Sequence, residues 1–235
     1  MIKLFIRSLQ SAIFIPILDL TNKIGFANQL IQDTGGLFDG DPIVLPIPND
    51  APPEIPRIIL KNKSESYSLN ISQNRIDLFF NEKSLKNNLP TRELSDVNQE
   101  FLDKTNLIIR SILKTSPTRV ARLGFIVTLQ GKIADKATAF VNKLYIKQRK
   151  SFENLYDVNL GLLKKEKVDR LDSNIWFRVN PLRKQGDPSD NKIVTVQFDI
   201  NTKSEELLNL SLENINKYFK EAAEYINKNV ISYFD

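Results

Sequence analysis

Apolar side chains occupy nearly every second position in seven segments of the 235-residue chain, and this alternation constrains the fold most strongly. The segments are 9–15, 67–71, 76–80, 123–129, 156–162, 175–179 and 194–200. A period of two places the apolar side chains on one face of a β-strand. Short turn-forming stretches separate several of these strands, which favours antiparallel pairing. The chain therefore predicts antiparallel sheet with one buried face.

Helical spacing appears between these strands. Apolar residues recur every three or four positions in 20–31, 94–113, 133–144 and 208–226. With a further short strand at 57–61, residues 1–117 and 118–235 both follow the order β-α-β-β-β-α, although no residue-level identity links them. We expect an α+β fold in which duplicated halves form a pseudo-dimer. Its antiparallel sheet or sheets would carry helices packed on one face, within one compact unit.

A proline-rich segment spans residues 42–56 and contains six of the chain's 11 prolines. This density excludes a helix or a central strand. The segment is also apolar, so it would either pack on the protein's own surface, which we favour, or dock onto a partner. Its candidate partner-binding residues are Ile43, Leu45, Ile47, Pro53, Ile55 and Pro56.

The chain contains neither histidine nor cysteine. These absences exclude Ser-His-Asp triads, cysteine nucleophiles, disulfides and the usual zinc sites. Carboxylate chemistry remains, and two stretches could support it: Asp39 with Asp41, and the D-x-K triplet at 190–192. Both stretches have the composition of turns, so a carboxylate metal-dependent enzyme is our third hypothesis. We expect no cofactor and no catalytic residue.

The net charge of +5 resides entirely in residues 118–235, which carry 20 basic and 15 acidic side chains. Aromatic residues, among them Trp176, are interleaved with the most basic stretch, as in proteins that bind single-stranded nucleic acid. The alternative is a solvated rim. The candidate contacts are Lys147, Arg149, Lys150, Lys164, Lys165, Lys167 and Arg170.

Two arginines lie at the start of the strand at 123–129. Arg119 and Arg122 are three positions apart, so in an extended strand they point to opposite faces. One of them would need a carboxylate partner, and Asp199 lies between two apolar residues of another strand. We expect a structural ion pair between Arg122 and Asp199. An anion-binding site is the alternative.

Residues 119–125 (RVARLGF) and 198–200 (FDI) carry a resemblance to a sporadically distributed, uncharacterised bacterial protein family of similar length. The resemblance implies no activity. The scattered distribution of that family is typical of antiviral defence or stress loci.

The expected function is a non-enzymatic, cytoplasmic protein-binding or regulatory module, either chaperone-like or a subunit of a bacterial defence or stress locus. A nucleic-acid-binding protein is the alternative. The expected partner is another protein, with nucleic acid and a homo-oligomer as further options. No membrane contact is expected, because no apolar stretch is long enough for a span.

Overall fold

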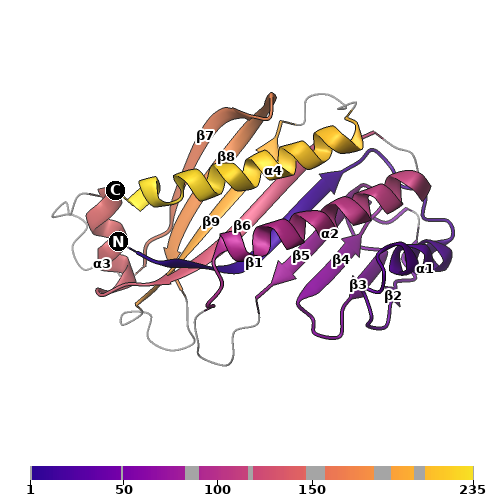
Figure 1. Ribbon diagram of the computed structural model, residues 1–235, viewed down its shortest axis with the longest axis horizontal. Helices are drawn as coiled ribbons and strands as arrows, with labels where there is room; N and C mark the ends of the chain where they lie inside the picture. Colours follow the sequence, from indigo (N-terminus) through magenta and orange to yellow (C-terminus); the bar gives the residue numbers. More distant parts are fainter. Residues whose placement is uncertain are drawn as a thin grey trace.

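A computed structural model describes residues 2–48, 50–82, 90–115, 119–146, 157–182, 192–203 and 210–234. Within these residues, nine strands form one antiparallel sheet in the order β2-β3-β4-β5-β1-β6-β9-β8-β7 (Figure 1). The strands are β1 (Leu4–Phe14), β2 (Ile43–Val44), β3 (Ile58–Lys61), β4 (Tyr67–Ile71), β5 (Arg75–Asn81), β6 (Arg122–Lys132), β7 (Leu160–Val168), β8 (Leu171–Pro181) and β9 (Ile193–Thr202). The predicted α+β class is confirmed, and the sheet is a single one.

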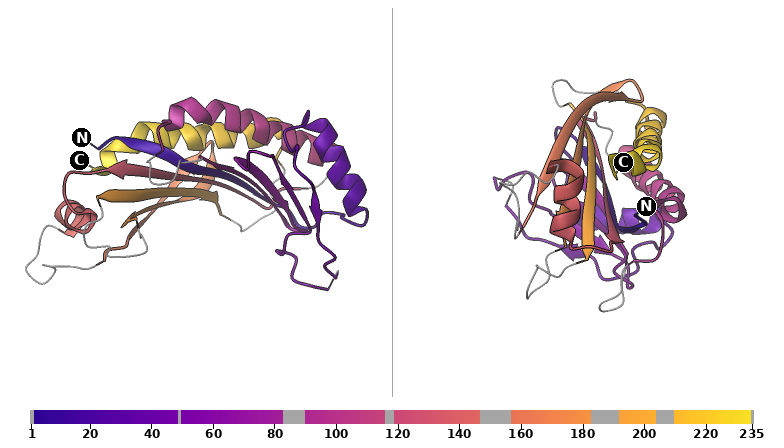
Figure 2. Two further views of the ribbon diagram at one scale, coloured as in Figure 1. Left: turned by 90° about the horizontal axis from the view of Figure 1, so that it is seen from below. Right: turned by 90° about the vertical axis from the view of Figure 1, so that its left-hand side faces the viewer.

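The helices of the described residues are α1 (Lys23–Asp33), α2 (Leu94–Thr115), α3 (Ala137–Val141) and α4 (Leu212–Asn229). A π-helical turn, η1 (Asn142–Ile146), continues α3, and a 3-10 turn, η4 (Ile231–Phe234), follows α4. Helices α2 and α4 lie side by side on one face of the sheet, with α1 next to α2, whereas α3 lies at the opposite end (Figure 1). The sheet arches with α2 and α4 on its outer side (Figure 2).

Strands β1 and β6 form the centre of the sheet. They pair from Leu4 and Gly131 to Phe14 and Arg122, with one irregularity between Ile6 and Ser8. Strand β5 pairs with the outer edge of β1, and β9 with the outer edge of β6. The predicted order of elements is therefore present, with β2 as an additional strand in the first half. Descent of the two halves from one ancestral unit remains a prediction.

The core lies between the sheet and the helices. Phe125 of β6 contacts Phe101 of α2 and Phe219 of α4, with both pairs of ring centroids 6.2 Å apart. All three side chains are buried. A hydrogen bond of 2.8 Å between Asn106 and Asn216 also joins the two helices. These contacts hold both long helices on the same central strand.

Local sequence signals mark the helix ends. The Gly35-Gly36 pair in the sequence predicts a left-handed stop for α1, and the φ values of 59° and 79° at these residues confirm it. The Asn22 side chain caps the start of α1 by accepting from Gly25 N, and Ser211 caps α4 by accepting from Asn214 N.

The hairpin of β7 and β8 lies later in the chain than the alternation indicated. We expected a strand at 156–162, but β7 runs from Leu160 to Val168. The turn is formed by Asp169 and Arg170, whose φ values of 42° and 70° suit a tight two-residue hairpin. Exposure explains the difference, because β7 is an edge strand with most side chains in solvent and so lacks an apolar period.

The proline-rich segment is organised around one buried arginine. Arg57 is 1% exposed, and its guanidinium donates to four backbone carbonyls of the segment and to one side-chain amide. The acceptors are Pro48 O, Ala51 O, Pro52 O, Ile55 O and Gln73 Oε1, at 2.6 to 3.5 Å. Prolines have no N–H to offer neighbouring carbonyls, so a side-chain donor stabilises this stretch.

The expected self-packing of the segment's apolar side chains is wrong in part. Ile43 is 44% exposed and Ile55 is 38% exposed. Leu45 and Ile47 are half-buried. The reason is that Ile43 lies in the two-residue edge strand β2, while Arg57 rather than an apolar cluster holds the rest of the segment. In the described part of the chain, no helix has the length and apolar character to cross a membrane.

Replacing Arg57 with methionine should lower the free energy of unfolding by about 2–4 kcal/mol, because the segment would lose the five hydrogen bonds of a fully buried guanidinium. Urea denaturation measures this loss. The matched control is Arg110→Met, since Arg110 is exposed on α2. A cost for Arg57→Met no larger than that of the control would show that Arg57 does not hold the segment.

The double variant Ile43→Ala, Leu45→Ala should cost less than about 2 kcal/mol in total, below the 2–5 kcal/mol typical of each fully buried aliphatic residue. The cause is the exposure of Ile43 and the partial burial of Leu45. Thermal melts check the loss against Leu69→Ala, which truncates a fully buried residue of β4. Equal losses in both variants would contradict the exposed position of the segment.

Candidate binding face of the sheet

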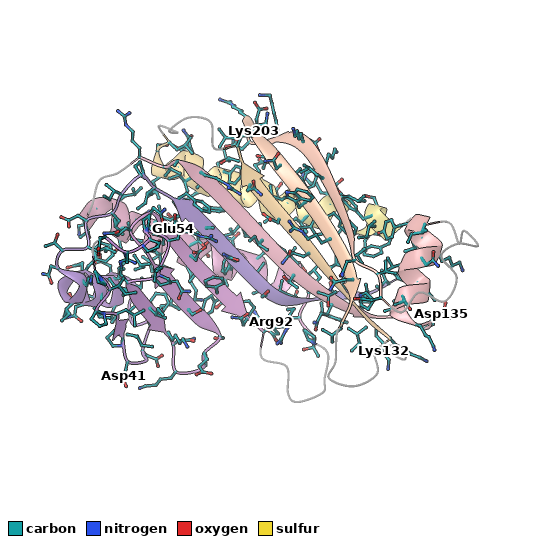
Figure 3. The ribbon with its side chains drawn as sticks, turned by 180° about the vertical axis from the view of Figure 1, so that it is seen from behind. Asp41, Glu54, Arg92, Lys132, Asp135 and Lys203 are labelled. Carbon is teal, nitrogen blue, oxygen red and sulfur yellow. The ribbon has the colours of Figure 1, made fainter. Side chains whose placement is uncertain are left out.

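The face of the sheet opposite α2 and α4 carries no helix in the described residues, and we call it the open face (Figures 2 and 3). Register identifies its side chains. Ser11 bonds to Thr105 of α2, and Phe125 packs on both long helices, so these two paired residues point to the helices. Their neighbours along β1 and β6 therefore belong to the open face.

One row crosses the open face from edge to edge. Its members, in order from β7 to β2, are Lys165, Asn174, Asn201, Gly124, Ala12, Asp77, Asn70, Ile59 and Ile43. The two central positions, Gly124 and Ala12, carry nothing larger than a methyl group. The amide of Asn201 flanks them on the β9 side, and the carboxylate of Asp77, followed by Asn70, flanks them on the β5 side. The centre of the face is therefore a low floor, and both residues are buried among their neighbours.

The next row contains an aromatic ring between two arginines. Phe14 of β1 is paired with Arg75 of β5 on one side and Arg122 of β6 on the other. The guanidinium carbons lie 4.7 Å and 5.0 Å from the ring centroid. Contacts of this kind are worth about 0.5–1 kcal/mol at exposed sites and more when desolvated. Register and stacking together fix both guanidinium groups.

A buried carboxylate organises the β5 side of the face. Asp77 accepts from Arg75 Nε at 2.7 Å and from Gln10 Nε2 at 2.8 Å. The Asp77 residue is only 8% exposed. A carboxylate in such a place must be paired and hydrogen-bonded, and both partners come from the open face itself.

A similar cluster lies on β8 and β9. Arg178 stacks on Trp176 at 5.0 Å from the ring centroid and forms an ion pair with Asp199 at 3.4 Å. Gln197 accepts a second bond from Arg178, and Asn201 donates to Asp199. The open face therefore presents two arginine–aromatic stacks, one in each half of the sheet.

The expected ion pair between Arg122 and Asp199 is corrected by this geometry. Asp199 lies opposite Ile126 and Trp176, and its cation is Arg178. Arg122 lies four residues along β6 from Ile126, which is about 13 Å in an extended strand.

The predicted basic residues divide between the two faces. Lys165 and Lys167 belong to the open face, where Lys167 pairs with Asp172 at 3.3 Å. Lys164 faces the helices, near the ring of Tyr225, and its bond to Glu166 raises its pKa. Arg170 forms the hairpin turn. Lys147, Arg149 and Lys150 lie outside the described residues.

The residues of the proline-rich segment lie at the opposite edge. Ile43 ends the middle row of the open face, next to Ile59. Pro53 and Ile55 are exposed, whereas Leu45, Ile47 and Pro56 are half-buried. The structure thus brings one residue of this set onto the open face.

Acidic residues form no group of three that could hold a metal ion in the described residues. The Asp39 side chain accepts from Lys63 N at 2.7 Å and stabilises a turn. Asp190 lies outside the described residues.

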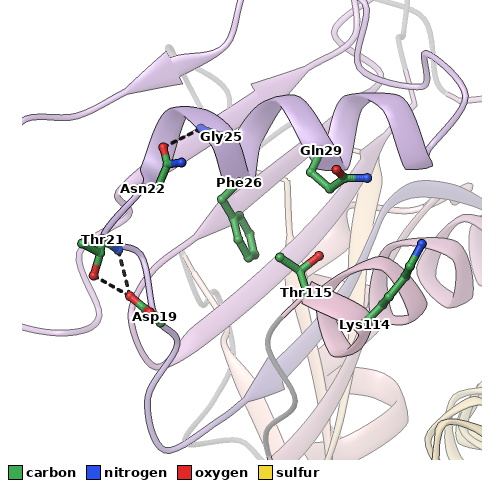
Figure 4. A pocket seen from close by; sticks show the side chains of 8 residues that line it. All are labelled: Asp19, Thr21, Asn22, Gly25, Phe26, Gln29, Lys114 and Thr115. Atoms are coloured by element: carbon green, nitrogen blue, oxygen red, sulfur yellow. Dashed lines mark hydrogen bonds between the residues drawn. The ribbon is translucent and has the colours of Figure 1, made fainter.

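A cavity of about 700 Å³ opens between α1 and the end of α2 (Figure 4). Phe26 lines its inner side, and Gln29 and Lys114 contribute polar groups. Its carboxylate, Asp19, already accepts two hydrogen bonds from Thr21, which lower its pKa. Its charged groups do not converge as those of the open face do.

The sequence analysis missed Gln10, Phe14, Arg75, Asp77 and Arg178. A signal for them exists, because they occupy the alternate positions of strands whose apolar residues were recognised. Arginines, amides and aromatic rings in these positions are unusual for a surface that is merely solvated.

In comparisons with known proteins, no family model matches the chain, and no curated protein is similar to it in sequence. The resemblance to the scattered bacterial family accordingly remains a prediction.

Replacing Asp77 with alanine should lower the free energy of unfolding by about 1–3 kcal/mol, because Gln10 and Arg75 lose a buried acceptor. The control is Asp172→Ala, which removes an exposed ion pair with Lys167 and should cost less than about 1 kcal/mol. Urea denaturation of both variants checks the difference. Equal effects would mean that the Asp77 cluster does not stabilise the face.

Proposed function

We propose that the protein is a non-enzymatic, cytoplasmic binding protein whose open face binds single-stranded nucleic acid. The observation that carries this proposal is the pair of arginine–aromatic stacks, at Phe14 and Trp176, on an uncovered face. Bases stack on aromatic rings and on guanidinium planes, and cations attract the phosphates. Such stacking accepts any base, so it favours a single strand, whose bases are accessible.

The size of the open face supports the same ligand. Phe14 and Trp176 lie three strands apart, and Trp176 is in the row of Gln10, four residues along β1 from Phe14, which together give a separation of about 19 Å. The floor at Gly124 and Ala12 separates them, the amide of Asn201 borders it, and the amide of Asn70 lies one strand beyond Asp77 on the other side. Amides can hydrogen-bond to base edges, while Lys165 and Lys167 add positive charge at one end.

Titration with a single-stranded oligonucleotide should quench the fluorescence of Trp176, the only tryptophan of the chain. Stacking of a base on the indole is the physical reason. Binding should also weaken as salt is raised, because phosphate contacts release counterions. The double variant Lys165→Glu, Lys167→Glu should bind at least tenfold more weakly.

The matched control is Arg110→Glu, Lys220→Glu, which makes the same change of charge on exposed positions of α2 and α4. Its affinity should stay within about threefold of the wild type, since these residues lie in the helix layer. Absence of quenching at low salt would overturn the proposal. An equal loss in the control would assign the effect to net charge instead of the open face.

The exposed isoleucines of the proline-rich segment favour a second function, binding of another protein. Ile43 and Ile55 present apolar surface beside stiff prolines, which suits a docking segment of a regulatory or defence-locus subunit. Ile43→Glu, Ile55→Glu should leave the melting temperature nearly unchanged and abolish co-purification with the product of a neighbouring gene. Retained co-purification would remove this candidate.

We also infer that the two halves arose by duplication. Strands β5 and β9 occupy matching places beside the central pair, and each carries an aspartate on the open face, Asp77 and Asp199. The two halves should accordingly superpose over three strands and two helices.

A further inference from the structure

We propose that Arg122 is a phosphate-binding residue of the open face, held in place by Phe14. This inference rests on the proposed function, and it names the group that anchors the backbone of the bound strand. Phosphate is the ligand class because the planar guanidinium donates two parallel hydrogen bonds to its oxygens.

The charge of Arg122 distinguishes it from the other arginines of the two stacks. Arg75 lies 2.7 Å from Asp77, and Arg178 lies 3.4 Å from Asp199. Among the described residues, no carboxylate forms an ion pair with Arg122, and its buried Nε has no hydrogen-bond partner. One of the three guanidinium groups therefore keeps an uncompensated charge and unused donors, which an anion could satisfy.

The surroundings of Arg122 also leave room for an anion. Gly124 is the next residue of β6 on the same face, and Ala12 is its partner on β1. Neither side chain extends over the floor, and Arg122 itself is partly exposed, so a phosphate could reach the guanidinium from the surface of the open face. The Phe14 ring restrains the guanidinium from the other side, which lowers the entropy lost on binding.

The decisive variant is Arg122→Gln, with Arg110→Gln on α2 as the control of equal charge. Oligonucleotide affinity is measured at several salt concentrations. Loss of one phosphate contact should reduce the slope of log K against log salt by about 0.7, the value for a single strand. The control should keep the wild-type slope. An unchanged slope in Arg122→Gln, with normal wild-type binding, would overturn this inference and leave the proposed function intact.

A second probe, inorganic pyrophosphate, separates the two proposals. It should raise the melting temperature of the wild type and of Arg110→Gln, because a ligand that binds only the folded protein stabilises it. It should not raise that of Arg122→Gln, because this variant lacks the guanidinium that binds the phosphate. That result without any oligonucleotide binding would support the phosphate site and refute the nucleic-acid function, and the source would be a small phosphate ester. Equal stabilisation of all three proteins, or of none, would refute the role of Arg122.

Arg122→Lys guards against a purely structural effect. Lysine retains the charge and loses the planar fork, so it should restore the salt slope while binding pyrophosphate more weakly than the wild type. A slope for Arg122→Lys as low as that of Arg122→Gln would indicate a packing defect and contradict phosphate binding.

Discussion

The pairing of β1 with β6 is the constraint on which the rest of the structure depends. Ten residue pairs set its register, and β5 and β9 then pair with the outer edges of these two strands. Because side chains alternate, a slip of one residue would move Phe125 from the core to the open face. The contacts of Phe125 with Phe101 and Phe219 then place both long helices on a single side. Register, helix placement and the existence of an uncovered face are thus consequences of one strand pair.

In a sheet covered on one side, the same strands must bury apolar side chains on one face and provide partners for polar side chains on the other. The helix side buries apolar groups, whose burial is favourable without any directional bond. On the open face, polar groups are partly withdrawn from water and must find partners beside them in the sheet. Asp77 and Asp199 do this by accepting from arginines and amides of adjacent strands. Arg122 differs from these arginines, because none of the described carboxylates pairs with it, and this difference is the basis of the proposed phosphate site.

Most of the fold could be predicted from the sequence, whereas most of the candidate site could not. Alternation found every long strand with a buried face, but it placed β7 too early because the exposed edge has no apolar period. The glycine stop of α1 followed from backbone geometry alone. The ion pair of Asp199 was assigned to Arg122 instead of Arg178, because partner choice depends on register between strands distant in sequence. Phe14 and Arg75 meet for the same reason, and no local pattern encodes their contact.

Arg57 has a further consequence for how the edge of the molecule opens. Arg57 directly precedes β3. Its guanidinium donates to backbone carbonyls between Pro48 and Ile55 and to the side chain of Gln73, in the turn between β4 and β5. The prolines leave this stretch few hydrogen bonds of its own, so it cannot keep its shape once the arginine withdraws. Loosening of the stretch and fraying of β2, β3 and β4 should therefore be a single cooperative event. Proteolysis of this loop would therefore require β2, β3 and β4 to open as well, at a free energy set by the pairing of these strands.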